Sequence, residues 1–453
     1  MVVEQLNIMR LKNVEIGMTN KRLVIVQVAG LGYEFLRRQG HDTWRDLKFQ
    51  PLDCVFPALT CTAQASFRTA LPPSGHGMIA NGLYHRDLRR PLLWEQSSGL
   101  VSGPRLWEAY RKRGKRVAML FWQQSLGEAV DMILSPAPVH KHGGGMIPSV
   151  YSKPEGLYAS LCNTLGNPFR LHRYWGPLAS AASSRWIARA TAAVLAGGAL
   201  APDLCLTYLP ALDYDLQRHG PGHASAERAL AELLYQLTLI RTAAETHGYD
   251  MIVFGDYAIG PVSEAILPNR ALHEAGLFRT RTVNGMLYPD FHTSQAFAMV
   301  DHEIAHVYVT ASGQAGVTAT IRECLSRLTG IGQILGPAEK SRAGIDHPHS
   351  GDLVLEAKPG TWFAYPWWST RKEAPDFAAH VDIHNKPGYD PCELFFGWPP
   401  VGVSQDPSRI RGSHGRTTAN ARAAWAATCP LPGAPTSLIQ LAECVRQRLE
   451  AAP

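Results

Sequence analysis

Long hydrophobic runs are missing from this sequence. No apolar stretch reaches the roughly 18–20 residues that a membrane-spanning helix needs. Residues 1–20 carry polar side chains every few positions, so they lack the continuous apolar segment and the cleavage site of a secretion signal. These two absences predict a cytoplasmic protein that has no membrane partner.

Charged residues are also scarce, at 18% of the 453 residues, and the formal net charge is only +6. This mild positive bias does not indicate a nucleic acid polymer as partner, although it is compatible with a small anionic substrate. The hydrophobic share of 45% is ordinary for a globular protein and excludes wholesale disorder. Composition and charge do not specify an oligomeric state.

Cysteine pairs of the CxxC type are absent, because the eight cysteines are scattered along the chain. Several of them lie in apolar runs, as Cys205 does between Leu204 and Leu206. Cysteines in such surroundings behave as small hydrophobic residues. We therefore expect buried free thiols in a reducing compartment.

Glycine and proline, in contrast, are plentiful, with 40 and 32 copies, which indicates many loops and a site built on loops. Short β-rich apolar runs predict buried strands at 23–28, 117–121, 204–209, 251–254 and 306–310. Helical patterns alternate with these runs, the longest of them over 224–247. We therefore expect an α/β fold in which a central, mostly parallel sheet has helices on both faces.

A chain of 453 residues is longer than a single hydrophobic core usually supports, so we expect more than one structural unit. We assign 20–264 and 366–403 to the α/β core and 265–365 to a small inserted α+β subdomain. Residues 404–453 form a C-terminal extension that is rich in Ser, Arg, Pro and Ala. We expect this extension to be loosely packed except for a final helix over 435–449.

Two aspartates follow predicted strands of the sheet. Asp213 comes after the run 204–209, and Asp256 comes after the run 251–254. In open parallel sheets, ligand-binding residues cluster in the loops beyond the carboxyl ends of the strands. The sequence therefore predicts a ligand site at this edge of the sheet.

Thr60 stands at the start of a predicted helix, in a segment that runs over 56–69 and continues through 72–82. The first N–H groups of a helix have no partner within it and lie at the positive end of the helix dipole. A hydroxyl group there can attack a bound phosphate while these N–H groups stabilise the developing charge. Taken alone, the segment favours a plain N-cap role for Thr60 or Thr62.

The longer pattern resembles the nucleophile segment of type I phosphodiesterases and nucleotide pyrophosphatases, a family of the alkaline phosphatase superfamily. In that segment a second Thr follows the first after nine positions, as Thr69 follows Thr60, and a Pro-x-x-His-Gly turn leads to an Asn, here Asn81. Three more stretches resemble family motifs in the required order, at 208–221, 255–259 and 382–390. The whole chain resembles a bacterial subgroup in which metal ligands have changed.

This resemblance implies an alkaline-phosphatase-like core and a metal-dependent hydrolase or transferase that acts on a small phosphorylated or related anionic molecule. Thr60 would attack the phosphorus, and Arg68, further along the helix, would hold a non-bridging oxygen. The parent family uses two divalent ions, usually zinc, that activate the nucleophile and stabilise the transition state. The resemblance implies that Asp213 and His384 are ligands of the first ion, and that Asp256 and Thr60 are ligands of the second.

The family's ligand pattern is broken at three positions. Ala29 stands where the family has an Asp, and Gln217 and Tyr257 stand where it has His. An amide oxygen and a phenol are poorer zinc ligands than imidazole. The alternatives are therefore two zinc ions, one ion, a different metal such as iron or manganese, or no ion, with Tyr257 in an acid–base role.

His302 and His306 match the H-E-x-x-H pattern of zinc proteases, which requires a helix so that both imidazoles share one face. Here the pattern continues into the strand-like run 307–310, which argues against a protease. On a strand, the two imidazoles could still be metal ligands or substrate contacts. The alternative is a purely structural role.

Three functions stay open on the sequence alone. The first is a phosphoester hydrolase or transferase of the nucleotide pyrophosphatase type, with Thr60 as its nucleophile. The second is a divergent biosynthetic enzyme on the same scaffold, with a different metal and non-hydrolytic chemistry. The third is a binding protein without catalytic activity.

Overall fold

The computed structural model of the protein describes residues 21–142, 146–310, 316–397 and 402–452. The expectation that no secretion signal precedes the fold rests on residues 1–20, which lie outside the described residues. Within the described ranges, no helix combines the length and the apolar character that crossing a membrane requires.

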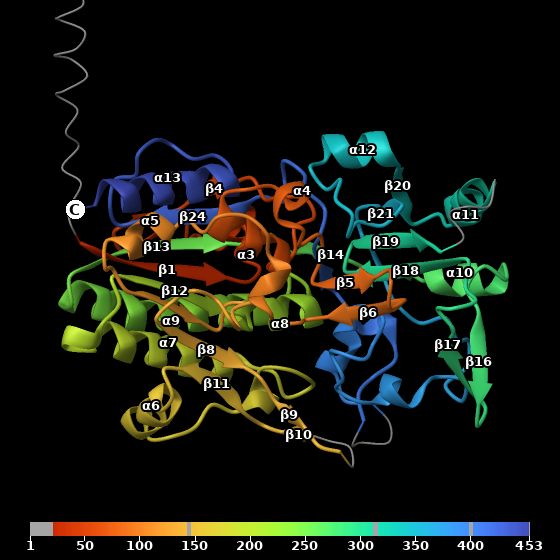
Figure 1. The fold of residues 1–453 in the computed structure, drawn as a ribbon, viewed down its shortest axis with the longest axis horizontal. Helices are drawn as coiled ribbons and strands as arrows, with labels where there is room; N and C mark the ends of the chain where they lie inside the picture. Colours follow the sequence, from red (N-terminus) through yellow and green to blue (C-terminus); the bar gives the residue numbers. More distant parts are fainter. Residues whose placement is uncertain (1–20, 143–145, 311–315, 398–401, 453) are drawn as a thin grey trace, which may run out of the picture.

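The largest sheet in the described part of the chain has eight strands (Figure 1). Their spatial order is β11 (Val150–Lys153), β8 (Met132–Pro136), β7 (Val117–Leu120), β12 (Leu204–Leu209), β1 (Arg22–Val28), β13 (Tyr249–Gly255), β24 (Ala423–Ala427) and β4 (Gln50–Leu52). The strands from β8 to β13 run parallel, whereas β11, β24 and β4 pair antiparallel with their neighbours. This confirms the expected mostly parallel sheet.

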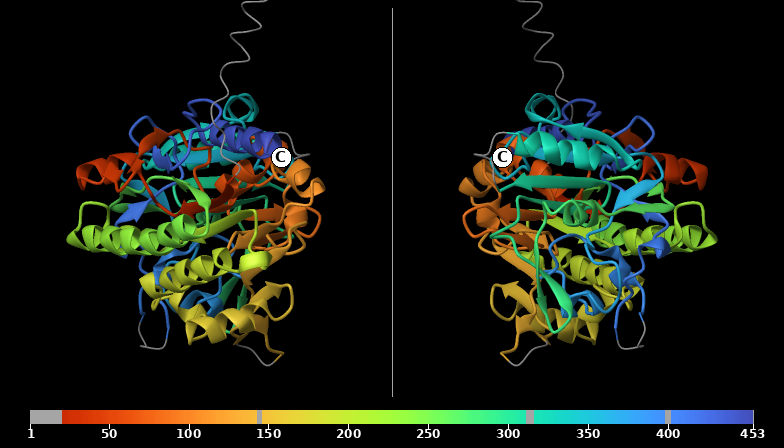
Figure 2. Two further views of the ribbon diagram at one scale, coloured as in Figure 1. Left: turned by 90° about the vertical axis from the view of Figure 1, so that its left-hand side faces the viewer. Right: turned by 90° about the vertical axis from the view of Figure 1, so that its right-hand side faces the viewer.

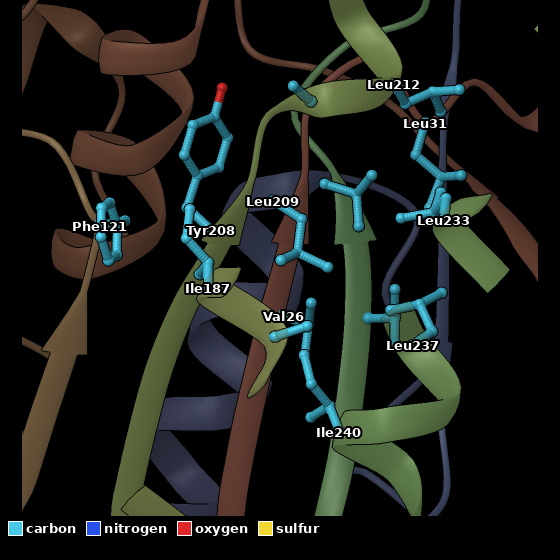
Figure 3. Close-up of a cluster of buried hydrophobic side chains, with 14 of the residues drawn as sticks. Val26, Leu31, Phe121, Ile187, Tyr208, Leu209, Leu212, Leu233, Leu237 and Ile240 are labelled. Atoms are coloured by element: carbon cyan, nitrogen blue, oxygen red, sulfur yellow. The ribbon is translucent and has the colours of Figure 1, made fainter. Parts of the chain in front are cut away.

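The central strands form because both of their faces are covered, so nearly every residue in them is buried and apolar. Helices α7 (Ala181–Leu195) and α9 (Ala224–Thr246) lie on one face, and α3 (Thr60–Thr69), α5 (Glu108–Lys112) and α13 (Leu438–Ala451) lie on the other (Figures 1 and 2). Figure 3 shows Val26 of β1 packing among side chains from α9, including Leu237 and Ile240.

A second sheet lies beside the first, at the right of Figure 1. Its strand order is β18 (Ala296–Asp301), β19 (Ile304–Val309), β21 (Leu353–Ala357) and β20 (Ile331–Leu335). Helices α10 (Pro268–Glu274), α11 (Val317–Ser326) and α12 (Pro337–Arg342) belong to the same region. All of these elements fall within the predicted subdomain 265–365, while the exact domain boundaries stay a prediction.

The C-terminal extension contributes to the core, so the expectation of loose packing is wrong. Strand β24 lies between β13 and β4 in the central sheet, and Ala423 and Ala424 are fully buried. Helix α13, close to the expected final helix, packs against α3. The run Ala-Ala-Trp-Ala-Ala was overlooked because small residues give a weak hydrophobic signal, although they pack well in a crowded sheet.

The remaining elements connect these layers. The short helices are α2 (Tyr33–Arg38), α4 (Pro73–His76), α6 (Leu157–Leu165) and α8 (Ala211–His219). The short paired strands are β2 (Thr43–Trp44) with β3 (Leu47–Lys48), β5 (Gly82–His85) with β6 (Arg90–Leu93), β9 (Val139–His140) with β10 (Met146–Ile147), β14 (Gly260–Pro261) with β23 (Gly412–Ser413), β15 (Glu264–Ile266) with β22 (Thr361–Phe363), and β16 (Thr280–Val283) with β17 (Met286–Pro289).

Candidate active site

A cavity of about 100 Å³ lies at the carboxyl ends of the parallel strands, where the sequence predicted a ligand site. Its walls come from the start of α3, the end of β12, helix α8, and the segment 383–394. Many of the lining side chains are aromatic: Trp94, Tyr174, Trp175, Tyr208, Tyr214, Tyr257 and Tyr389. We call it the Thr60 cavity, because the Thr60 side chain forms part of its wall.

Thr60 occupies the first turn of α3, and the structure assigns the N-cap to Leu59 instead. The Thr60 hydroxyl group is therefore free for other contacts. It lies 3.4 Å from the hydroxyl oxygen of Tyr257 and 3.5 Å from that of Tyr208. In Figure 3, Tyr208 extends past the end of β12, away from the apolar cluster around Val26. The two tyrosines thus direct their hydroxyl groups to the start of the helix.

A chain of hydrogen bonds leads from Thr60 to Asp213 on α8. The Tyr257 hydroxyl group donates to Asp213 Oδ1 at 3.1 Å. Because a phenol has one proton, the Thr60 hydroxyl group must be the donor in its contact with Tyr257. Gln217 Nε2 donates to Asp213 Oδ2 at 2.5 Å, and the Tyr389 hydroxyl group donates to Gln217 Oε1 at 3.0 Å. Burial raises the pKa of Asp213 to about 7, although the bonds from Tyr257 and Gln217 oppose this rise.

Asp256 lies next to Tyr257 and is fully buried. Its carboxylate accepts hydrogen bonds from Gln27 Nε2 at 3.0 Å and from the backbone N–H groups of Gly30 at 3.1 Å and Tyr257 at 3.0 Å. Burial raises its pKa to about 8 in spite of these donors. Asp256 therefore fixes the loops after β1 and β13, and it is not among the described residues that line the Thr60 cavity.

Four rings stack in a column along one side of the site. Tyr389 lies on His302 with centroids 3.7 Å apart, His302 lies 3.8 Å from His414, and His414 lies 3.4 Å from Tyr257. The Nδ1 atom of His302 contacts Asp301 Oδ1 at 2.7 Å, and that of His414 contacts the carbonyl oxygen of Ala58 at 2.8 Å. Because an Nδ1–H that donates to either oxygen leaves Nε2 as the acceptor, both Nε2 atoms carry a lone pair.

Neither Nε2 atom has a hydrogen-bond partner within the described residues. Burial lowers the pKa of both imidazoles well below the usual value, so His302 and His414 are neutral near pH 7. The Nε2 atom of His414 lies 4.0 Å from Asp213 Oδ1. The column therefore places two neutral bases beside the Tyr257–Asp213 pair.

His414 was missed by the sequence analysis, because the tail was expected to pack loosely. The signal that could have identified it is the sequence Gly-Ser-His-Gly at 412–415, in which the glycines allow close approach. A Cβ atom at Gly412 would lie 2.2 Å from the carbonyl oxygen of Leu216 on α8. Only glycine lets this segment pass so near α8 and deliver His414 to the site.

His384 is not among the described residues that line the Thr60 cavity, although the resemblance assigned it to the same ion as Asp213, which does line the cavity. Its Nδ1 atom contacts the carbonyl oxygen of Leu93 at 3.0 Å, and its ring lines a neighbouring cavity instead. The neighbouring residue Ile383 does line the Thr60 cavity. Further along the same segment, the Tyr389 hydroxyl group donates to Gln217 in the site.

Arg68 lies away from the Thr60 cavity, at the far end of α3, and is fully buried. It donates to the carbonyl oxygens of Gln123 and Gln124, and lies 3.6 Å from Glu128. Gln123 lines the cavity. Arg68 therefore positions the loop after β7, and the expected clamp on a substrate oxygen is not supported by its location.

His306 does not share a site with His302, as the H-E-x-x-H pattern would require. His302 lies in the turn between β18 and β19 with φ of 59°, whereas His306 belongs to β19. The Nδ1 atom of His306 accepts from the N–H group of Gly351, and its Nε2 atom contacts the carbonyl oxygen of Ile79. Both ring nitrogens of His306 are thus engaged in hydrogen bonds that hold the second sheet to its neighbouring segments.

Comparison with known proteins gives the family. Residues 36–390 match the family described as type I phosphodiesterase / nucleotide pyrophosphatase. The chain belongs to this family. Among curated proteins, none matches this sequence.

Solved structures show the same fold. One is phosphonoacetate hydrolase from Sinorhizobium meliloti 1021 in complex with phosphonoformate, with a TM-score of 0.59, 16% identity and 96% of each chain covered. Another is murine ectonucleotide pyrophosphatase / phosphodiesterase 5, with a TM-score of 0.59, 12% identity and 95% of each chain covered. An inactive form of the murine protein in complex with AMP is similar as well, with a TM-score of 0.58, 12% identity and 95% coverage of each chain. These likenesses confirm the alkaline-phosphatase-like α/β fold.

The side chains that could act as metal ligands in this family member do not fit a centre of two metal ions. The carboxylate oxygens of Asp213 and Asp256 face N–H and O–H donors, where a cation would need free lone pairs. The Gln217 oxygen is itself bound by Tyr389. Among the residues described, no three His, Cys, Asp or Glu side chains are grouped so that they could hold a metal ion.

Lys386 supplies the one cationic side chain among the described residues that line the Thr60 cavity. Its Nζ atom lies 2.8 Å from Asp390 Oδ2 and 2.6 Å from Glu393 Oε1. Burial would lower the pKa of Lys386, but the two carboxylates raise it overall, so the ammonium group stays charged. Because two acidic groups already share this charge, the cavity offers little surplus positive charge to a ligand.

Proposed function

We propose that the protein is a phosphoester hydrolase or transferase that acts on a small phosphodiester through the Thr60 hydroxyl group. The observation that carries this proposal is the position of that hydroxyl group. It lies at the start of α3, in the wall of a cavity, and donates to a tyrosine that donates to a carboxylate. Family membership supports the reaction class, and the AMP and phosphonate complexes of structural neighbours are consistent with a small phosphorus-containing ligand.

The first step is attack of Thr60 Oγ1 on the phosphorus atom. The Thr60 proton passes to the Tyr257 oxygen, and the Tyr257 proton passes to Asp213, whose pKa of about 7 suits a base near neutral pH. The bond between phosphorus and the leaving oxygen breaks, and the alcohol leaves after taking a proton from water. The positive end of the α3 dipole stabilises the charge that develops on the non-bridging oxygens, while the Cys61 N–H group donates to Asn81 Oδ1 at 3.0 Å.

The second step returns the enzyme to its starting state. Water attacks the phosphorus of the phosphoryl-threonine, and the bond to Thr60 Oγ1 breaks. The proton held by Asp213 returns through Tyr257 to Thr60 Oγ1, so that the hydroxyl group and the carboxylate are both restored. Another alcohol in place of water would give the transferase reaction. His302 lines the Thr60 cavity and its Nε2 atom has no partner in the described structure, so we assign to it the proton of the attacking molecule.

The charge of the cavity favours a diester over a monoester. A monoester carries close to two negative charges at pH 7, whereas a diester carries one. The available positive groups are the start of α3 and Lys386, and Lys386 is already paired with Asp390 and Glu393. A singly charged substrate is therefore the better match.

The test compares two valine substitutions on the same helix turn. Thr60→Val keeps the shape of the side chain but removes the hydroxyl group, and we expect kcat/KM on bis(p-nitrophenyl) phosphate to fall on the order of 10³-fold or more. Thr62→Val is the control, because Thr62 is equally buried and its hydroxyl group has no partner in the described structure. Retained activity in Thr60→Val, with Thr62→Val unchanged, would show that Thr60 is not the nucleophile.

A further inference from the structure

A second cavity, of about 250 Å³, adjoins the Thr60 cavity. Of its thirteen described lining residues, nine are apolar: Pro138, Met146, Pro148, Leu171, Trp175, Pro177, Leu178, Val381 and Ile383. We call it the apolar cavity. Large hydrophobic side chains usually avoid water, yet Leu178 is 41% exposed and Met146 is 36% exposed at this cavity.

The two cavities share a wall. Trp175 and Ile383 line both of them, so the two cavities lie next to each other on either side of these side chains. Gly176 lines the Thr60 cavity and Val381 lines the apolar one, and a Cβ atom at Gly176 would lie only 2.7 Å from Val381 Cγ2. Since Gly176 also has a φ of 85°, glycine allows the two segments that separate the cavities to pack this closely.

Two of the four polar residues at the apolar cavity are engaged elsewhere. His384 contacts the carbonyl oxygen of Leu93, and the Asp382 carboxylate accepts from the Asn385 backbone and side chain. The other polar side chains among the described lining residues are His140 and His172, so the cavity presents few directed donors and acceptors to a nucleobase edge, whereas hydrocarbon needs none.

We infer that the apolar cavity binds a hydrocarbon chain on the alcohol part of the phosphodiester whose phosphorus atom Thr60 attacks. This rests on the proposed function and adds the substrate class: a phosphodiester of a medium-length aliphatic alcohol. The phosphate group occupies the Thr60 cavity, and the chain passes Trp175 and Ile383. Burial of the chain supplies binding free energy that the Thr60 cavity, where Lys386 faces the carboxyl groups of Asp390 and Glu393, does not supply through charge.

The experiment measures affinity separately from turnover. The Thr60→Val protein is titrated in a calorimeter with methyl alkyl phosphates that carry a single charge, from methyl ethyl phosphate to methyl dodecyl phosphate. Each buried methylene is worth about 0.8 kcal/mol, so we expect affinity to rise about fourfold per methylene and to level off once the cavity is full. The methyl ester of AMP serves as the nucleobase comparison and should bind no better than the short-chain esters.

Two variants test whether the dependence of affinity on chain length arises at the apolar cavity. In Thr60→Val protein, Leu178→Asp places a carboxylate at the cavity and should remove most of the chain-length dependence. Val381→Phe fills part of the volume and should make the affinity level off at a shorter chain. Leu200→Asp is the matched control, since Leu200 is an exposed leucine elsewhere and its substitution should leave the dependence intact.

The outcomes separate this inference from the proposed function. If affinity does not rise with chain length, or if the AMP ester binds better than the octyl ester, the inference is overturned even when wild-type protein hydrolyses diesters through Thr60. If affinity rises with chain length and Leu178→Asp abolishes the rise, the inference stands. In that case, a lack of diester hydrolysis would refute only the assigned chemistry.

Discussion

Replacing Lys386 with methionine tests the electrostatic description of the site. The methionine side chain has a similar length but no charge, so Asp390 and Glu393 lose the ammonium group that lies 2.8 Å and 2.6 Å from them. Both carboxylates are nearly inaccessible to solvent. Removing one partner from a buried ion pair costs about 3–5 kcal/mol, because the charge that stays behind has no compensation. We therefore expect Lys386→Met to lower the free energy of unfolding by about that amount near pH 8.

The loss of stability in Lys386→Met should be larger at high pH than at low pH. Burial already raises the pKa of Glu393 in the folded protein, and removal of Lys386 raises it further. A carboxyl group whose pKa is higher in the folded than in the unfolded state favours folding when protonated. Its contribution is therefore lost as the pH rises from about 4.5, the unfolded value, through the folded one. The difference between Lys386→Met and wild type should accordingly shrink as the pH falls towards 4.5.

Urea unfolding at several pH values between 4.5 and 8 measures this difference. The double variant Lys386→Met/Glu393→Gln is the control, since the neutral amide removes one of the two buried charges and should recover part of the lost stability. An Lys386→Met protein that is as stable as wild type at pH 8 would refute the account. So would a loss of stability that is independent of pH and that Glu393→Gln does not reduce.

Other consequences follow from the same structure. Because Asp213 must be ionised to accept the Tyr257 proton, kcat/KM should rise with pH through about 7. Asp213→Asn should lower kcat/KM on the order of 100-fold or more and should remove this rise, and a pH–rate profile of both proteins checks the two expectations. Arg68→Met should cost about 3 kcal/mol in urea unfolding, because it removes a buried cation bound to two carbonyl oxygens and to Glu128. The exposed Arg327→Met should cost less than about 1 kcal/mol, and equal losses for the two would contradict the positioning role of Arg68.

The central fold was predictable because its strands are buried on both faces. The runs 23–28, 117–121, 204–209 and 251–254 consist mostly of apolar residues, and each one falls in a strand of the central sheet. Strand β24 was not predictable in this way, since its alanines carry little hydrophobic signal. Its place between β13 and β4 depends on contacts with segments far away in the sequence.

The site was only partly predictable. Thr60, Asp213, Gln217 and Tyr257 lie together because they follow the strands and helices that the motifs identified. Order along the chain could not decide between two histidines near the C-terminal end. His384 matched the expected motif position. In the structure, His414 lies near Asp213 instead, because its segment contains glycines that pack closely against α8.

The stacking of His302 and His414 between Tyr257 and Tyr389 had no counterpart in the sequence. These four residues come from segments far apart along the chain, and all four lie in turns or loops. Loop conformation depends on tertiary contacts rather than on hydrophobic periodicity. For the same reason, the broken ligand pattern at Ala29, Gln217 and Tyr257 could be seen in the sequence, but the hydrogen bonds that replace it could not.

The most direct test of the central claim is mass spectrometry of the peptide that contains Thr60. Protein stripped of metal with a chelator is mixed with bis(p-nitrophenyl) phosphate and quenched in acid during turnover. The account predicts a p-nitrophenyl phosphoryl group on Thr60, formed through Tyr257 and Asp213 without two bound ions. Chelation that abolishes both turnover and the adduct, with zinc restoring them, would contradict it, as would an adduct on any other residue.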